Sequence, residues 1–439
     1  MTRRISRRSF VKAGAGGLAA IAVGNVLDLP WVFTNVARAQ DPVAVQLTIR
    51  EALVEMIDLL PVYHWVFEAP TTGPLMPGPT IIAEEGAAVT VSVANTLDEE
   101  HSWAIRQPSG ITHETGGDPG PFVPPAAFIA DTGPIAPGGN ATITFTAPAA
   151  GTYIYEDALN SPVNRVLGLQ GMFISTPVPG ATTPYTTPTP NVARLFADLG
   201  TAAHFPGTPW NPARTWLWIF SSIDPRFNAI AEAGGAIDPA DFVANSDPLY
   251  WMISGKTGFF SSHDERIKIS GFVGNPALIR VMNVGITTHS PHIHGNHVYP
   301  IARNGIVLDN LVFLDTWSVR PGETVDILHP FIQPPDIPVF PPVQEPFPLR
   351  YPMHCHIEMS QTAGGANYPQ GLLTDWELAG PLGGEKGGPA PTVLPLPISV
   401  QGTPQAAPAN ARTAAHTAFA GPRPATRIPG PLDTHSHGL

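Results

Sequence analysis

The chain has a single cysteine and few charged residues. Among its 439 residues the one Cys is at position 355, and only 13% are Asp, Glu, Lys or Arg. One cysteine cannot form an internal disulfide, which excludes a disulfide-stabilised scaffold. The low charge, together with 52 Pro and 42 Gly, argues against long charged helices and favours short strands joined by turns.

The N-terminus has no apolar run long enough to span a bilayer. An Arg-Arg pair at residues 7 and 8 precedes an apolar, Gly- and Ala-rich run over residues 13–26, and a small-x-small pattern follows at residues 37–39. This arrangement predicts a twin-arginine signal peptide over residues 1–39 rather than a membrane anchor. We therefore expect export by the twin-arginine route to a periplasmic or extracellular location.

Basic residues are scarce in the part that would remain. Cleavage after residue 39 removes six basic residues and one acidic residue, which leaves 17 basic and 34 acidic ones and a net charge near −17. So acidic a surface argues against nucleic acid and against a membrane as partners. It suits an exported protein that meets small solutes.

The hydrophobic pattern divides the chain into two β-rich parts. Apolar and polar residues alternate over residues 43–49 and 88–93, which is typical of half-buried strands. Strand-like runs return at 215–220 and 277–283. We predict a first β domain over 40–177, a Pro/Thr-rich linker over 178–211, a second β domain over 212–380 and a Pro/Ala/Gly-rich tail over 381–439. An insertion at 225–247 is expected to hold one or two short helices.

Two histidines flank the single cysteine. If residues 353–359 form a strand, His354 and His356 share one face and Cys355 faces the other way, because side chains alternate along a strand. Such a strand could serve two metal centres, one on each face. The alternative is a buried cysteine that acts as a small apolar residue beside two incidental histidines.

A second segment, residues 289–295, shows the same alternation of histidines between two faces. His292 and His294 are two residues apart, and His289 lies at an odd offset from both. Together the segments would present a four-imidazole face of His292, His294, His354 and His356, and a thiolate–imidazole face of Cys355 and His289. Imidazole and thiolate ligands suit copper or zinc rather than calcium or magnesium, so we favour a metal over the alternative.

These motifs resemble the last cupredoxin domain of the multicopper oxidases. The resemblance rests on three motifs, which are His-x-Pro-His-x-His-Gly at residues 289–295, His-Cys-His-Ile at 354–357, and Asp-x-Trp-x-Val-x-Pro-Gly within 314–323. The resemblance implies an all-β fold of two cupredoxin-like Greek-key β-sandwich domains, with copper as the cofactor.

The resemblance also implies a role for each ligand. Cys355 and His289 match ligands of the mononuclear blue (type 1) copper. The remaining matches belong to the oxygen-reducing trinuclear cluster, with His292 as a type 2 ligand and His294, His354 and His356 as type 3 ligands.

The first domain resembles the family in its strands but departs from it in chemistry. Residues 77–86, 151–155 and 167–174 match the family's strand and turn motifs. Where the family carries two His-x-His pairs, this chain has Glu156-Asp157-Ala158 and the segment 101–106. Six nearby polar residues could form a different site, namely His101, His113, Glu114, Asp118, Glu156 and Asp157. We interpret them instead as solvated loop residues and strand-end groups.

The blue-copper motif departs from the family as well. The second histidine expected five residues after the cysteine is Ser360, and the axial methionine expected ten residues after it is Gly365. Met359, four residues after Cys355, is a candidate thioether ligand, although a core-packing role is the alternative. His297 and His329 are outside candidates for the second imidazole.

Three hypotheses about function remain open. The chain could be a multicopper-oxidase-type oxidoreductase with an incomplete trinuclear site, acting on small phenols or metal ions with oxygen as acceptor. It could instead bind or sequester copper, or zinc, without turnover. It could also be a structural cupredoxin protein stabilised by a metal. By analogy with two-domain members of the family, a homotrimer is expected.

Overall fold

The computed structural model describes residues 42–70, 72–74, 76–107, 127–201, 205–334, 346–365, 367–383 and 405–406. The predicted signal peptide lies outside the described residues, as do His113, Glu114, Asp118 and most of the tail.

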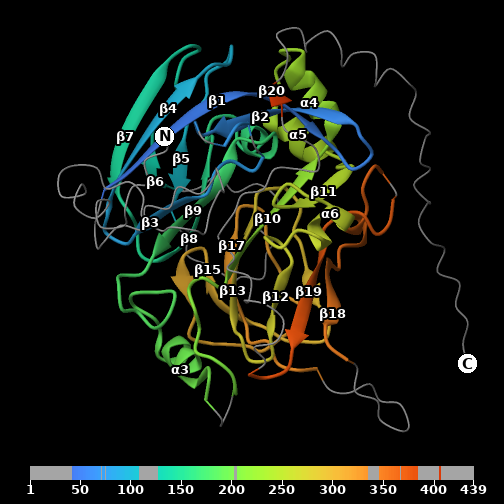
Figure 1. Ribbon diagram of the computed structural model, residues 1–439. Helices are drawn as coiled ribbons and strands as arrows, with labels where there is room; N and C mark the ends of the chain where they lie inside the picture. The colour runs from blue at the N-terminus through green and yellow to red at the C-terminus, as the bar shows by residue number, and fades with distance from the viewer. Residues whose placement is uncertain are drawn as a thin grey trace, which may run out of the picture.

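The first domain is a sandwich of two sheets, drawn in blue and teal in Figure 1. One sheet has the order β2-β1-β4-β7 and the other β3-β9-β8-β5-β6. Its strands are β1 (Val43–Glu55), β2 (Pro61–Glu68), β3 (Ile81–Glu84), β4 (Ala88–Asn95), β5 (Ala104–Arg106), β6 (Phe128–Asp131), β7 (Asn140–Thr146), β8 (Gly151–Glu156) and β9 (Gln170–Thr176). Along the start of β1 every second side chain is buried, which is the predicted alternation. The short β20 (Gln405–Ala406) pairs with β1.

The second domain is also a sandwich of two sheets. Their orders are β11-β10-β13-β17-β15-β16 and β12-β19-β18-β14. The strands are β10 (Thr215–Ile223), β11 (Tyr250–Ile253), β12 (Ile269–Phe272), β13 (Ala277–Asn283), β14 (Pro291–Ile293), β15 (Tyr299–Arg303), β16 (Ile306–Val307), β17 (Thr324–His329), β18 (Leu349–Cys355) and β19 (Leu373–Gly380). Its core holds Trp216, Trp218, Trp251 and Trp376, all 1% exposed or less.

The two sandwiches share one strand plan. In each, the first strand runs parallel to a neighbour, as β1 does with β4 and β10 with β13. In each second sheet a parallel pair, β3 with β9 or β12 with β19, is continued by an antiparallel strand, β8 or β18. A further antiparallel strand, β5 or β14, then follows. The predicted all-β fold class is confirmed, and each element of the metal motif has a counterpart in the first domain.

Apolar contacts join the two sandwiches. One interface cluster packs Ile154, Met172 and Ile174 of the first domain against Leu217, Ile219, Met282 and Val284 of the second. Beside it, Asp326 accepts hydrogen bonds from Thr152 of the first domain and from Arg280, at 2.5 and 2.9 Å. The domains therefore bury both apolar and charged groups against each other.

The insertion at 225–247 forms the two expected helices, α4 (Pro225–Glu232) and α5 (Pro239–Asn245). Phe227 and Phe242 stack edge to face at 4.7 Å and belong to the hydrophobic core of the first domain. Asn228 donates to the carbonyl oxygen of Tyr63 in β2 at 2.7 Å. An element of the second domain thus completes the core of the first.

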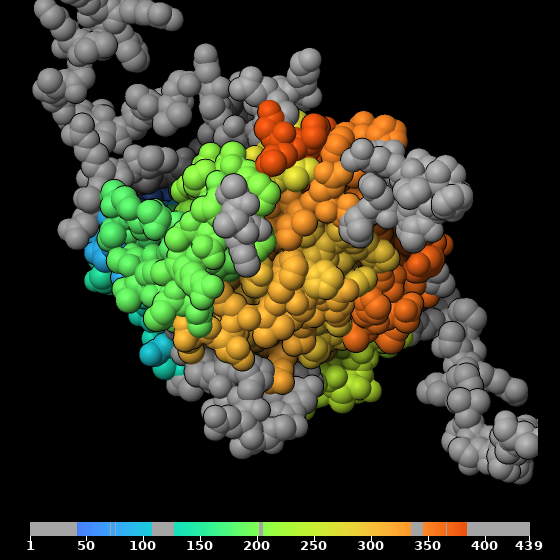
Figure 2. Space-filling model, turned by 90° about the horizontal axis from the view of Figure 1, so that it is seen from below, coloured from blue at the N-terminus to red at the C-terminus, as the bar shows by residue number. Residues whose placement is uncertain are grey.

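The segment 178–211 contains a helix, α3 (Pro190–Asp198), that begins at the N-cap Thr189. Its buried face packs Val192, Leu195 and Phe196 against Leu278, Ile301 and Leu328 of the second domain. In Figure 2 this segment, drawn in green, lies on the surface beside the orange residues of the second domain. The other short helices are α2 (Val163–Val166), α6 (Gly258–Ser262) and the 3-10 helix η2 (Glu358–Gln361).

Replacing Phe227 tests the shared core. Phe227→Ala should destabilise the protein by about 3–5 kcal/mol, because it leaves a cavity between α4 and the first domain. Ile230→Ala on the same helix is the control, since Ile230 is 40% exposed and its loss should cost no more than about 0.5 kcal/mol. Urea unfolding of both variants measures the difference. Equal effects would show that α4 does not complete the core.

Candidate metal centre

Two short antiparallel strands position the histidines. β14 pairs with β18 so that His292 lies directly opposite His354. Side chains directly opposite each other in an antiparallel pair share one face and lie close together. At the end of β14, Trp376 of β19 donates its indole N–H to the carbonyl oxygen of His294 at 2.7 Å, which fixes that end against the sheet.

The four imidazoles form one cluster. Five ring pairs among them have centroids between 4.7 and 5.7 Å apart, and the rings belong to His292, His294, His354 and His356. The Nε2 atoms of His294 and His354 are 3.0 Å apart. Two nitrogens that each lie about 2.0–2.1 Å from one metal ion are separated by roughly 3 Å when their angle at the ion is near a right angle.

The rings need a further rotation to hold an ion. Among the described residues, no three His, Cys, Asp or Glu side chains are already arranged as a metal site. The rings of His354 and His356 are stacked, with centroids 5.1 Å apart and an angle of 21° between the ring planes. His294 and His356 are exposed and have room to turn.

The surroundings favour the neutral form of two of these imidazoles, His294 and His354. Burial lowers the pKa of His294, and the neighbouring imidazoles lower it further. Burial also lowers the pKa of His354. A neutral imidazole is the form that binds a metal. The hydroxyl of Thr316 lies 2.8 Å from Nδ1 of His292, which leaves Nε2 of that ring for the cluster.

The cluster faces solvent within a single chain. His294 and His356 are exposed, and His292 and His354 are half-buried. In the described part of the chain, no side chain of the first domain makes a hydrogen bond, an ion pair or a ring contact with these imidazoles. A second molecule could therefore reach the cluster from outside.

On the opposite face, Cys355 sits in a closed pocket. Its Sγ atom lies 3.5 Å from Nδ1 of His289 and accepts backbone N–H groups from Ser290 at 3.3 Å and Ile357 at 3.4 Å. Cys355 and His289 are fully buried. Burial raises the pKa of the Cys355 thiol and lowers the pKa of His289 to about 3, so both groups are neutral near pH 7. His289 Nε2 is buried without a hydrogen-bond partner.

Met359 does not lie in this pocket. The strand ends at Cys355, and Met359 stands on η2 with 58% of its surface exposed. Met359 is therefore no ligand candidate beside Cys355, because side chains alternate between faces only as far as the strand continues. Ser360, fully buried, is the η2 residue beside the thiol, and its hydroxyl favours the thiolate form.

The other candidates for a second imidazole lie elsewhere. His297 is exposed and packs on Phe313 with ring centroids 5.0 Å apart. His329 is buried, accepts the N–H of Phe331 at 3.0 Å and packs against Trp376. Within the described residues, His289 is thus the imidazole that contacts Cys355.

In the first domain an ion triad occupies the corresponding strands. β5 pairs with β8 so that Ala104 lies opposite Glu156. The carboxylate of Glu156, fully buried, accepts from Arg106 at 2.5 and 3.1 Å and from Arg165 of α2 at 3.2 Å. Our interpretation of Glu156 as a solvated strand-end group is wrong, because the two guanidinium groups neutralise it inside the protein.

A His–Asp pair occupies the place of the thiolate pocket. Nδ1 of His101 lies 2.6 Å from Asp157, and both residues are buried. Asp157 also accepts the backbone N–H groups of Ser102 at 3.0 Å and Leu159 at 2.9 Å. Burial would lower the pKa of His101, but Asp157 and Glu99 outweigh it and raise that pKa. These residues are structural rather than solvated, which corrects the interpretation of both.

The two domains have the same strand register at these positions but carry different side chains there. The strand registers match Ala104 to His292, Arg106 to His294, Glu156 to His354 and Asp157 to Cys355. Equivalent residues also donate backbone N–H groups to Asp157 and to Cys355. One donor directly follows the histidine, as Ser102 and Ser290 do. The other lies two residues after the acceptor, as Leu159 and Ile357 do. The sequence contains a signal for this repeat, because His-Ser-x-x-Ile begins at both residue 101 and residue 289.

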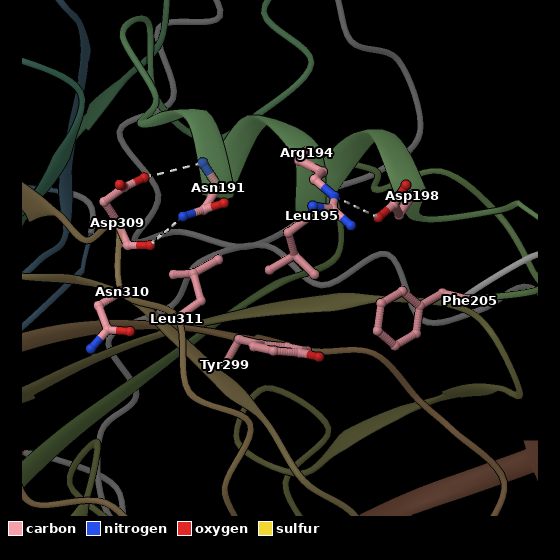
Figure 3. Close-up of a pocket in the computed structure, with 9 residues that line it drawn as sticks. All are labelled: Asn191, Arg194, Leu195, Asp198, Phe205, Tyr299, Asp309, Asn310 and Leu311. Atoms are coloured by element: carbon pink, nitrogen blue, oxygen red, sulfur yellow. Dashed lines mark hydrogen bonds and ion pairs between the residues drawn. The ribbon is translucent and has the colours of Figure 1, made fainter.

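A separate groove of about 360 Å³ lies between α3 and the loop at 309–311 (Figure 3). Tyr299 and Phe205 line it together with Arg194 and Asp198 of α3. Arg194 and Asp198 pair with each other at 3.9 Å. None of the four imidazoles lines this groove, so it is distinct from the histidine cluster.

Comparison with known proteins agrees with this two-sandwich fold. A multicopper oxidase family model matches residues 69–178, which lie in the domain without the histidine cluster. A protein of Oryza sativa subsp. japonica named laccase-9 is 25% identical over 258 residues, which cover 57% of this chain and 38% of the rice protein. The chain thus spans less than half the length of this curated relative.

Solved structures show the same fold. A blue copper oxidase from Nitrosomonas europaea superposes with a TM-score of 0.54 at 20% identity, over 77% of this chain and 86% of the other. A copper-containing nitrite reductase from Thermus scotoductus gives 0.52 at 17% identity, over 81% and 64%. The predicted cupredoxin-like fold is confirmed. None of the helices in the described ranges is long and apolar enough to cross a membrane.

Acid titration tests the ion triad. Burial alone would raise the pKa of Glu156, but Arg106 and Arg165 hold it below its ordinary value of 4.5. Its contribution to stability is therefore present above about pH 4.5 and is lost as pH falls through the folded-state pKa. Glu156→Gln should cost about 1–3 kcal/mol at neutral pH, and the difference from wild type should shrink on acidification.

Urea unfolding from neutral pH to about pH 3 follows this difference. Glu68→Gln is the control, because the pair of Glu68 with Arg50 is partly exposed and should contribute less than about 1 kcal/mol. A difference between Glu156→Gln and wild type that stays constant with pH would contradict the assignment.

Proposed function

We propose that this chain, which belongs to the multicopper oxidase family, is an exported copper-binding protein whose second domain holds the metal at the four-imidazole cluster. The observation that carries the proposal is the register of β14 and β18, which sets His292 opposite His354 and gathers two more imidazoles around them. Imidazole clusters suit copper, and copper is the metal of this family.

The residues present fit a copper ion at this cluster. Four imidazoles supply nitrogen ligands, and the contact of Thr316 with His292 orients one of them. When bound, the copper would supply one-electron redox chemistry. The chain's own residues would hold the ion at the surface, where a small molecule or another metal ion could approach it.

The closed pocket fits a copper ion less well. A blue-copper site uses two histidines, a cysteine and a weak axial ligand. Here Cys355 has His289, while Ser360 fills the position of the second imidazole and Met359 points to solvent. A buried thiolate with one imidazole lacks the ligands that would stabilise its charge, so we propose that Cys355 binds copper weakly or not at all.

An oxidoreductase acting on small phenols or metal ions, with oxygen as acceptor, is the second candidate. The thiol–imidazole pair beside the cluster favours it, because the strand that holds Cys355 also holds His354, and His356 follows directly after its end. Against it stands the first domain, where Arg106 and Glu156 replace imidazoles that would complete a multi-electron cluster. A structural zinc or copper site is the third candidate.

The open face also bears on assembly and location. Because the cluster faces solvent, a second copy of the chain could cover it, and by analogy with two-domain members of the family we propose a homotrimer. The acidic composition and the predicted signal peptide support an exported protein that meets small molecules or metal ions. The match covers only 38% of the rice relative, so the activity of the whole protein is part of this proposal.

Removing one imidazole tests the cluster. His354→Ala should weaken copper binding by more than about tenfold, because a ligand is lost and losses of outer-sphere partners already cost 10–100-fold. His297→Ala is the matched control, since His297 is exposed and contacts Phe313 rather than the cluster. Calorimetric titration of the mature protein with copper measures both. Equal affinity in the two variants would place the metal elsewhere.

The thiol pocket is tested by its visible spectrum. Copper-loaded wild type should lack an intense blue thiolate-to-copper band, and Cys355→Ser should bind copper at the cluster as wild type does. The variant should lose some stability, because a buried apolar group is replaced by a polar one. An intense band that vanishes in Cys355→Ser, with copper-dependent oxygen uptake, would favour the oxidoreductase instead.

A further inference from the structure

The ion triad of the first domain also touches the second domain. Arg165 is 3% exposed, and besides Glu156 it donates from Nε to the carbonyl oxygen of Val284 at 2.9 Å. Its Nη2 reaches the carbonyl oxygen of Gly285 at 3.4 Å. One guanidinium group therefore joins the first domain to the turn that follows β13.

Arg106 reaches a second turn of the same domain. It packs so closely on Gly322 that a Cβ added at this glycine would lie 2.5 Å from the Nη1 atom of Arg106. Gly322 has φ +71°, a conformation that glycine adopts at little cost. Glu156 holds both arginines, so one carboxylate links the two turns through two guanidinium groups.

These two turns carry the loop that closes the cysteine pocket. Asn283 binds Gly322 and Glu323 through its backbone, and its side chain donates to the carbonyl oxygens of Thr287 and Val319. Val319 in turn exchanges backbone hydrogen bonds with His289 at 2.8 and 2.9 Å. The next residue, Ser290, donates its N–H to the sulfur of Cys355.

We propose that Arg165 of the first domain, held by Glu156, is a positioning residue that fixes the 284–290 loop of the second domain over Cys355. The first domain thus acts on the pocket through the carbonyl oxygens of Val284 and Gly285. Glu156, which holds Arg165, lies at the strand position where the second domain carries His354. This role is independent of whether copper binds, because every contact in it belongs to the polypeptide.

The physical basis is the free-energy cost of leaving the carbonyl oxygen of Val284 without the hydrogen bond that Arg165 donates. The carbonyl oxygen of Val284 is buried with the rest of that residue, so removing the guanidinium group leaves a buried acceptor unpaired. The loop then has fewer contacts that oppose local opening. Glu156 keeps its pair with Arg106, so the change is confined to the joint between the domains.

The single cysteine makes the test direct. In the full mature chain without added metal, Arg165→Met should raise the rate of alkylation of Cys355 by iodoacetamide by about tenfold or more. Hydrogen exchange of the amides of His289 and Ser290 should accelerate with it. Arg165→Lys, which keeps the charge but loses the planar fork, should lie between the variant and wild type.

Arg280→Met is the matched control. Arg280 is also 3% exposed and joins the domains, but it donates to Thr152 and Asp326 rather than to the 284–290 loop. Its alkylation rate should stay within about twofold of wild type under conditions where all variants are folded. If Arg165→Met matches wild type, or if Arg280→Met speeds alkylation equally, Arg165 contributes to general stability and the proposal is overturned.

Discussion

Between β14 and β18, the antiparallel register sets His292 opposite His354, and the rest of the site depends on that pairing. Because side chains alternate along a strand, the same register sends Cys355 to the other face. A slip of one residue would exchange the two faces, so that the sulfur faced solvent and imidazoles entered the core. The fully buried core around Cys355 and Trp376 opposes such a slip.

The same register occurs once more in the chain with a different chemical outcome. Between β5 and β8 it brings together Arg106 and Glu156, where the second domain brings together His294 and His354. A guanidinium–carboxylate pair and a pair of neutral imidazoles both satisfy polar groups at neighbouring strand ends. The first joins opposite charges permanently, whereas the second leaves lone pairs available for a metal ion.

The pockets behind these strands differ in the same way. In the first domain a hydrogen bond of 2.6 Å joins His101 to Asp157, and in the second Cys355 lies 3.5 Å from His289. The shorter contact is a hydrogen bond between an imidazole and a carboxylate. The longer one joins two neutral groups, and its buried His289 Nε2 is left without a partner. The first domain thus pairs its polar groups with one another, whereas among the described residues of the second the Cys355 thiol and Nε2 of His289 have no charged partner.

The sequence alone determined what depends on local geometry. The two-residue spacing of the histidines predicted a shared face, and the alternating apolar pattern predicted two β domains, because both follow from the period of a strand. The same reasoning failed at Met359, where the strand had already ended and a 3-10 helix turned the side chain to solvent. It also missed that the segment 178–211 forms α3, whose apolar face packs on the second domain.

Only the tertiary structure decided which polar residues are paired and which are open. Arg106 and Glu156 are 50 residues apart, and Arg165 meets Val284 across 119 residues, so no local pattern shows that these charges are buried together. The exposure of His294 and His356 likewise follows from tertiary packing and not from their spacing in the sequence. The strand period determined the faces on which the ligands lie, and the packing inside the second domain decided that Cys355 is buried while the imidazole face is open to solvent.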